Sequence, residues 1–173
     1  MTLPPRWRKA VLTTHVVTSV GWLGAVGAYI ALDLVASLSG EADRVRAAHL
    51  AMEVTATSVI VPLAIASVVI GIINALSTSW GLFRHYWVVV KLLLTLVATT
   101  VLLLEVPTIR MLAGSAADGV DPGALPGTLP HSVGGALVLL LITVLSIYKP
   151  RGETPYGWRR RQGSAGRSAA RTA

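Results

Sequence analysis

The sequence predicts an all-α protein that forms an antiparallel bundle of four transmembrane helices. Hydrophobic residues make up 53% of the 173 residues and charged residues 13%, which is about half the ~25% charged fraction usual for soluble domains. The hydrophobic residues gather in four segments, each near the roughly 20 residues that a helix needs to cross a bilayer. A short polar turn after the first segment favours antiparallel neighbours. The predicted spans cover about 10–38, 47–76, 86–111 and 131–148.

The first span carries a polar stripe that must avoid lipid. At about 100° per residue, its most polar and aromatic side chains fall on one narrow face. These are His15, Trp22, Tyr29 and Asp33. Lipid cannot hydrogen-bond a polar side chain, so this face should meet other helices or a wet cavity.

The other spans supply faces that could meet this stripe. The second has an inward face that includes His49, Glu53, Ser67, Gly71 and Asn74. Its small residues favour close helix approach, and Pro62 on the other side should kink it. The most polar stripe of the third span is Lys91, Ala98 and Glu105, and the fourth begins near His131.

The remaining segments are predicted to be irregular. The Gly/Pro-rich stretch 113–130 should be a loop. We therefore expect residues 1–148 to form the transmembrane domain. Residues 149–173 should form a basic, mostly disordered cytoplasmic tail.

Charge distribution predicts the orientation in a bacterial cytoplasmic membrane. All but three of the 15 Lys and Arg residues fall on the side that holds both termini, together with a single acid, Glu153. The positive-inside rule places both termini in the cytoplasm. The basic tail should contact anionic lipid headgroups, worth about 1 kcal/mol per basic residue near the surface, and we expect no nucleic acid partner.

Two polar clusters are predicted at different depths. Towards the cytoplasm, His15, Asn74 and Lys91 should lie at similar levels. The alternative is that Lys91 extends its ammonium group to the headgroups and His15 bonds a hydroxyl.

Towards the outside, four side chains from four helices could bind a divalent metal or relay protons. These are Asp33, Glu53, Glu105 and His131. The alternative is a solvated rim whose acids pair with arginines.

The histidines also suggest haem b, which helical bundles hold by axial histidines. One histidine lies near the start of each span: His15, His49, His85 and His131. His85 and His49 are expected at the interfaces, so His15 and His131 are the better ligands. These two should lie near opposite ends of the bundle and therefore cannot share one iron. The absence of cysteine excludes thiolate metal sites and c-type haem attachment.

Three stretches resemble an uncharacterised bacterial family of small four-span integral membrane proteins. They are HVVTSVGWLGAVGAY, GLFRHYWVVVKLLLTLVATTVLLL and SIYKPRGETPYGWRRR. More distantly, His15, Trp22 and Gly24 match the first span of copper-resistance D proteins and of membrane protoporphyrinogen oxidases. These resemblances imply copper handling or haem-dependent oxidation. The chain departs from the copper pattern because it has only three methionines.

The leading expectation is an integral membrane protein that serves as a b-type haem-binding redox component, with His15 as the best ligand. The alternative is a non-enzymatic accessory subunit, or a small ion or metal transporter that uses the outer acidic cluster. A membrane protein partner or a homo-oligomer fits either alternative.

Overall fold

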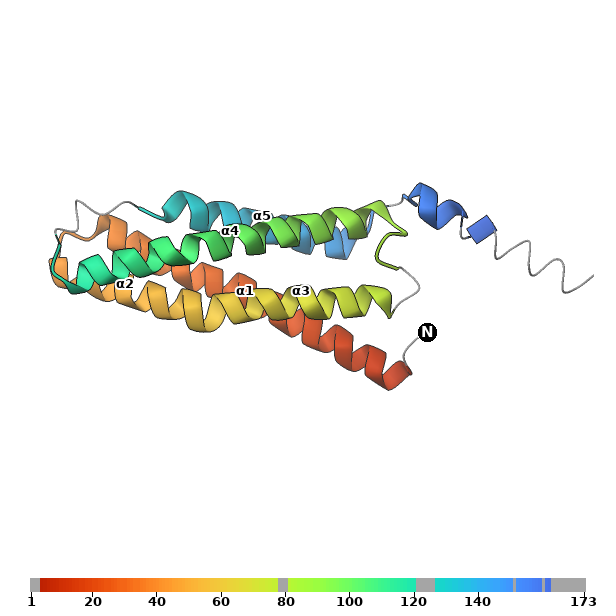
Figure 1. Ribbon diagram of the computed structural model, residues 1–173, viewed down its shortest axis with the longest axis horizontal. Coiled ribbons are helices and arrows are strands. Elements are labelled where there is room, and N and C mark those ends of the chain that lie inside the picture. Colours follow the sequence, from red (N-terminus) through yellow and green to blue (C-terminus); the bar gives the residue numbers. More distant parts are fainter. Residues whose placement is uncertain (1–3, 78–80, 121–126, 151, 160, 163–173) are drawn as a thin grey trace, which may run out of the picture.

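The protein is a bundle of long apolar helices (Figure 1). A computed structural model describes residues 4–77, 81–120, 127–150, 152–159 and 161–162. Within these ranges, four helical rods are long and apolar enough to cross a membrane, which confirms the predicted all-α four-helix bundle. The elements are α1 (Pro5–Leu38), α2 (Ala42–Thr55), the π-helical turn η1 (Ala56–Ile60), α3 (Val61–Leu76), α4 (Tyr86–Ala117) and α5 (Leu129–Tyr148). The three elements α2, η1 and α3 together form one rod.

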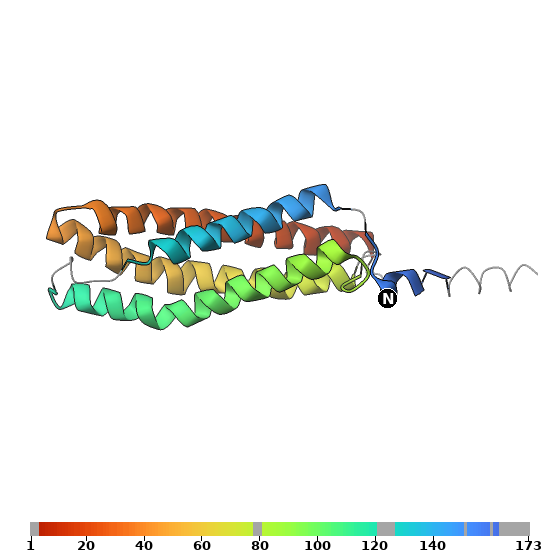
Figure 2. The same ribbon diagram turned by 90° about the horizontal axis from the view of Figure 1, so that it is seen from above.

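The four rods form a ring in chain order. Helix α1 packs against the α2–α3 rod and α5, and α4 packs against the same two neighbours. Figures 1 and 2 show that the N-terminus, the connection between α3 and α4 and the C-terminal segment lie at one end. We call this the basic end. The opposite end holds the α1–α2 turn and the start of α5, and we call it the acidic end.

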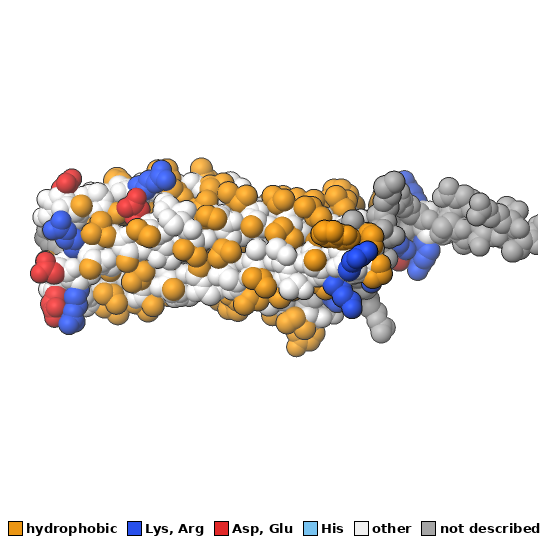
Figure 3. Space-filling view, turned by 90° about the horizontal axis from the view of Figure 1, so that it is seen from below, with side chains coloured by type: hydrophobic (Ala, Val, Ile, Leu, Met, Phe, Trp, Pro, Cys, Tyr) orange, Lys and Arg blue, Asp and Glu red, His pale blue; other side chains and the backbone are white. Residues whose placement is uncertain are grey.

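The flank of the bundle is apolar, as a membrane requires. Figure 3 shows hydrophobic side chains covering the surface between the two ends and charged side chains gathered towards those ends. Large apolar residues such as Val17, Leu104 and Leu137 are more than half exposed. Such exposure would be costly in water and is favourable against acyl chains. The chain is therefore a multi-pass integral membrane protein.

Helix α4 extends beyond its predicted end. The sequence predicted an irregular loop from Ala113, but α4 continues to Ala117. Ala113 and Ala116 are 1% and 5% exposed, so the added turn is stabilised by packing. Tertiary burial of an apolar face is the main source of helix stability in proteins.

The π-helical turn accommodates Pro62, the residue predicted to kink the second span. Proline has no N–H, and its ring collides with the carbonyl four residues earlier in a regular α-helix. Immediately before it, the Val61 N–H bonds the Ala56 carbonyl, a five-residue step. The wider turn relieves this crowding without ending the rod.

The C-terminal segment folds back onto the start of α4. The Thr154 N–H donates to the Arg84 carbonyl at 3.0 Å, and the Tyr86 N–H donates to the Gly152 carbonyl at 3.3 Å. A helical turn follows at residues 155–159, inside the region predicted as a disordered tail. Residues 163–173 of that tail lie outside the described residues.

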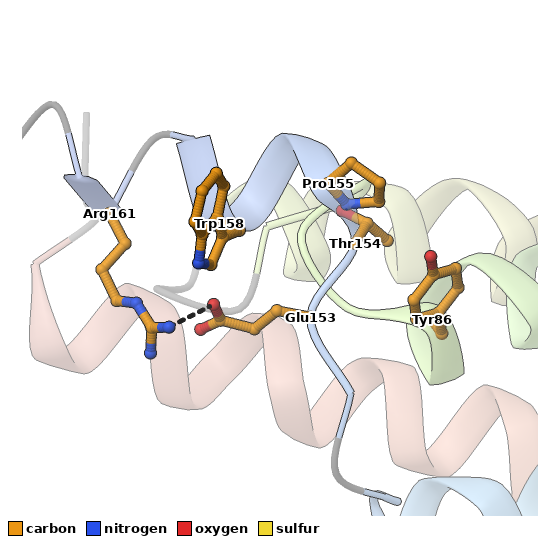
Figure 4. A pocket seen from close by; sticks show the side chains of 6 residues that line it. All are labelled: Tyr86, Glu153, Thr154, Pro155, Trp158 and Arg161. Atoms are coloured by element: carbon orange, nitrogen blue, oxygen red, sulfur yellow. Dashed lines mark ion pairs between the residues drawn. The ribbon is translucent and has the colours of Figure 1, made fainter.

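Side chains complete this contact, which we call the basic-end clamp. The Gly157 N–H donates to the Thr154 hydroxyl at 3.2 Å, which caps the turn. A Cβ at Gly157 would lie 2.5 Å from the Arg84 carbonyl oxygen, so the approach requires glycine. Figure 4 shows Glu153 and Arg161 paired within the C-terminal segment, with 3.4 Å between the carboxylate and guanidinium atoms.

Candidate functional site: two polar regions inside the bundle

A cavity of about 340 Å³ lies among α1, η1, α4 and the start of α5. We call it the acidic-end cavity because it occupies the half of the bundle nearest that end. Most of its wall is apolar, including Trp22, Ile60 and Leu139. Trp22 is 3% exposed, which places this predicted residue inside the bundle at the cavity wall.

A buried carboxylate, Asp33, lies behind the polar end of this cavity and binds two hydroxyls that line it. Asp33 is 1% exposed. Its Oδ2 accepts hydrogen bonds from the hydroxyls of Thr128 at 2.8 Å and Ser132 at 3.0 Å. The Tyr29 hydroxyl lies 3.3 Å from the Thr128 hydroxyl oxygen. Because Thr128 donates its single hydrogen to Asp33, Tyr29 is the donor in that bond.

The sequence analysis missed Thr128 and Ser132 as site residues. Thr128 precedes α5, and its carbonyl accepts the His131 and Ser132 N–H groups at 3.0 and 3.1 Å. Two hydroxyls four residues apart lie on one face of a helical turn. A buried aspartate requires hydrogen-bond donors. The spacing of Thr128 and Ser132 could therefore have indicated the partners of Asp33.

His131 and Glu105 lie at the rim of the same cavity. Their closest atoms, Nε2 and Oε1, are 3.6 Å apart, and the side chains are 58% and 24% exposed. This pair comes from the group predicted to bind metal or relay protons. Asp33 instead binds hydroxyls, and Glu53 lies partly buried on α2.

The described residues contain no group of three or more His, Asp or Glu side chains arranged to hold a metal ion. The alternative of a solvated rim does not describe Asp33 either, because this carboxylate is buried. Among the arginines of the acidic end, Arg44 pairs with Glu41 at 3.0 Å on the exposed surface. That pair lies outside the predicted cluster.

Two of the four histidines, His49 and His85, take part in contacts that belong to the fold itself. His49 is 7% exposed, and its Nδ1 lies 2.9 Å from the Val45 carbonyl oxygen within α2. His85 precedes α4, and its backbone forms a bridge with Glu153. Neither residue lines the acidic-end cavity.

His15 occupies a different environment, at the contact between α1 and α3. A Cβ at Gly71 would lie 2.9 Å from Cε1 of the imidazole, so the ring sits where a side chain would otherwise be. Beside it, the Ser19 and Ser67 hydroxyls are 2.7 Å apart. Nδ1 of His15 is buried and makes no hydrogen bond of standard geometry among the described residues, although the ring lies close enough to the Ser67 backbone carbonyl to interact with it. The expected alternative, an imidazole bonded to a hydroxyl, therefore does not apply to this nitrogen.

The predicted cluster around His15 is partly assembled. Lys91 lies close enough to His15 for their charges to interact. Asn74 is three residues beyond Gly71 on α3 and partly buried. The bundle thus contains one polar region in each half, His15 with Lys91 towards the basic end and Asp33 with its hydroxyls towards the acidic end.

Comparison of the chain with protein-family models, curated proteins and solved structures gives no match.

Proposed function

We propose that this integral membrane protein is a b-type haem-binding redox component and that His15 would be the residue that holds the haem iron. The observation that carries the proposal is the buried Nδ1 of His15, which makes no hydrogen bond of standard geometry among the described residues, although the ring lies near the Ser67 backbone carbonyl. Leaving a buried polar atom unpaired costs about 1–3 kcal/mol. A nitrogen lone pair held in this way is suited to an electron-pair acceptor such as haem iron.

The surroundings of His15 support this role. The close contact with Gly71 holds the imidazole against α3, and a fixed orientation favours metal ligation. Lys91 adds a positive charge nearby, which suits the carboxylates of a haem. Bound iron would supply one-electron chemistry, and the protein would contribute ligation, orientation and a low-dielectric setting. The resemblance of His15, Trp22 and Gly24 to haem-associated first spans points the same way.

His131 is a candidate for a separate site and cannot bind the same iron as His15. His15 precedes Asp33 by 18 residues, which is about 27 Å of helix, and Asp33 bonds Ser132, the neighbour of His131. His131 lies at the opposite end of the bundle, near the start of α5. A bis-histidine site formed by these two residues is therefore excluded by distance.

The absorption spectrum of protein purified in mild detergent from haem-replete cells tests this proposal. We expect a Soret band in the wild type and its loss in His15→Ala. His49→Ala is the matched control, because this buried histidine already bonds its own helix, and it should keep the band. Wild-type protein without a Soret band would refute the proposal, and loss in His131→Ala alone would move the site to the other half.

The second candidate function is a non-enzymatic accessory subunit or a small ion transporter. It is favoured by Glu105 and His131, which line one cavity, and by Asp33, which binds the lining hydroxyls of Thr128 and Ser132. Carboxylates and an imidazole are groups that can relay protons. Proton flux into proteoliposomes should fall in the triple variant Asp33→Asn, Glu53→Gln, Glu105→Gln. Unchanged flux would eliminate the transport version. A stable partner complex without cofactor would support the subunit version.

The location that we propose is the bacterial cytoplasmic membrane, with both termini in the cytoplasm and the basic tail near anionic lipid. Because the chain has no cysteine, single introduced thiols report topology cleanly. An impermeant thiol reagent should label Gly40→Cys at the exposed acidic-end turn in intact cells. It should label Gln162→Cys only after the membrane is permeabilised.

A further inference from the structure

The acidic-end cavity is accessible from the side of the bundle. Val97 and Val101 of α4 line the cavity, yet they are 59% and 42% exposed. On α5, Gly134 and Gly135 also line it, and a Cβ at either position would meet no atom within 4 Å. The cavity thus opens between α4 and α5, on a flank that faces acyl chains. A lipid-soluble molecule could enter there without crossing water.

The interior of the cavity combines apolar walls with hydrogen-bonding groups at one end. Trp22 and Tyr29 contribute aromatic rings to the wall, which favour stacked or edge-to-face contact with another ring. Glu105 supplies a carboxylate acceptor, and His131 supplies a ring nitrogen 3.6 Å from it. The Tyr29 hydroxyl donates to Thr128 and so retains capacity to accept. Acceptors therefore predominate, and a ligand must bring hydroxyl donors.

We propose that the acidic-end cavity binds a lipid-soluble quinol, a hydroxylated aromatic ring that carries an apolar tail. The ring lies among Trp22 and Tyr29, a ring hydroxyl donates to Glu105 beside His131, and the tail leaves between α4 and α5. A volume of about 340 Å³ is at the lower end of small-molecule pockets, roughly 300–1,000 Å³. It suits a ring head with the tail left in the bilayer. The site lies in the other half of the bundle from His15 and does not depend on haem.

Other ligand classes match the cavity less well. A fatty acid would bring a second carboxylate towards Glu105, with Asp33 buried behind the wall, and like charges repel strongly where the dielectric constant is low. A water-soluble polar molecule would leave most of its hydrogen-bonding groups against apolar walls without partners. A simple alcohol can satisfy Glu105 but leaves the aromatic surfaces without a ring to contact.

Binding can be measured by titration calorimetry on the full chain in lipid nanodiscs. The probe is decyl-benzoquinol kept reduced. Its dimethyl ether, which lacks the hydroxyl donors, and decanoate are the comparison ligands. We expect saturable binding of the quinol and at least about tenfold weaker binding of both comparison ligands. The ether lacks the charge-assisted hydrogen bond to Glu105, and decanoate brings a like charge towards it.

Two variants locate the site. Gly135→Leu places a side chain in the open space of the cavity and should weaken quinol binding by about tenfold or more. Gly27→Leu is its matched control, since a Cβ there also meets nothing within 4 Å and Gly27 does not line the cavity. Glu105→Gln keeps the shape and removes the charged acceptor, so it should also weaken the quinol and leave binding of the ether unchanged.

Several results would overturn the proposal. These are absence of saturable quinol binding, equal affinity for the ether or for decanoate, and unchanged affinity in both Gly135→Leu and Glu105→Gln. If Gly135→Leu does not fold, the Glu105→Gln comparison decides alone. Loss of the Soret band on substitution of His15 would leave these expectations unchanged.

Discussion

Replacing Thr128 with valine should destabilise the protein more than removing any other hydroxyl around Asp33. Valine keeps the shape of threonine and removes the hydroxyl group. The change eliminates the 2.8 Å bond to Asp33 and leaves the Tyr29 hydroxyl without its 3.3 Å partner. Side-chain hydrogen bonds in membrane proteins average about 0.6 kcal/mol and reach about 1.7 kcal/mol. Loss of two bonds should therefore lower the free energy of unfolding by about 1–3 kcal/mol.

Ser132→Ala provides the matched comparison. Its hydroxyl also donates to Asp33, at 3.0 Å, and its other hydrogen bond among the described residues is to the Leu129 carbonyl of its own helix. We expect this variant to lose about 1 kcal/mol. Thr128→Ser keeps the hydroxyl and should recover most of the stability lost in Thr128→Val.

Reversible unfolding in mixed detergent micelles, followed by circular dichroism, measures these differences. A double-mutant cycle between Asp33→Ala and Thr128→Val should give a coupling energy of about 1 kcal/mol. The reasoning fails if Ser132→Ala costs as much as Thr128→Val, or if the coupling is indistinguishable from zero. Either result would mean that the hydroxyls do not stabilise the buried carboxylate.

Three further substitutions test other parts of the bundle. In Gly157→Ala the new Cβ would lie 2.5 Å from the Arg84 carbonyl oxygen, so the clamp should detach and trypsin should cleave the C-terminal segment faster, while the bundle unfolds as before. In Gly71→Ala the new Cβ would lie 2.9 Å from His15 Cε1. The imidazole must then move, which should shift any Soret maximum while stability changes by less than about 1 kcal/mol, because alanine also favours the helix. Ala64→Leu overpacks a residue with 0% exposure and should cost about 1–3 kcal/mol, measured by the same unfolding assay.

Much of the architecture was predictable because the bilayer limits the choices. Spans must be helical, and their polar side chains must turn away from lipid. The stripe of Trp22, Tyr29 and Asp33 follows from this requirement, and these residues are indeed 3%, 5% and 1% exposed. The helix ends were less predictable, because burial of Ala113 and Ala116 extends α4 into a stretch whose composition favours a loop.

The sequence by itself determined the number of crossings, their order and the face that each turns inward, since helical periodicity and hydropathy are local properties. Only the tertiary structure decided which inward side chains meet. Asp33 meets hydroxyls 95 and 99 residues away, and Glu105 lies beside His131 of another helix. The rotation and tilt of each packed rod set such contacts, and these arise from the fit of all four rods together.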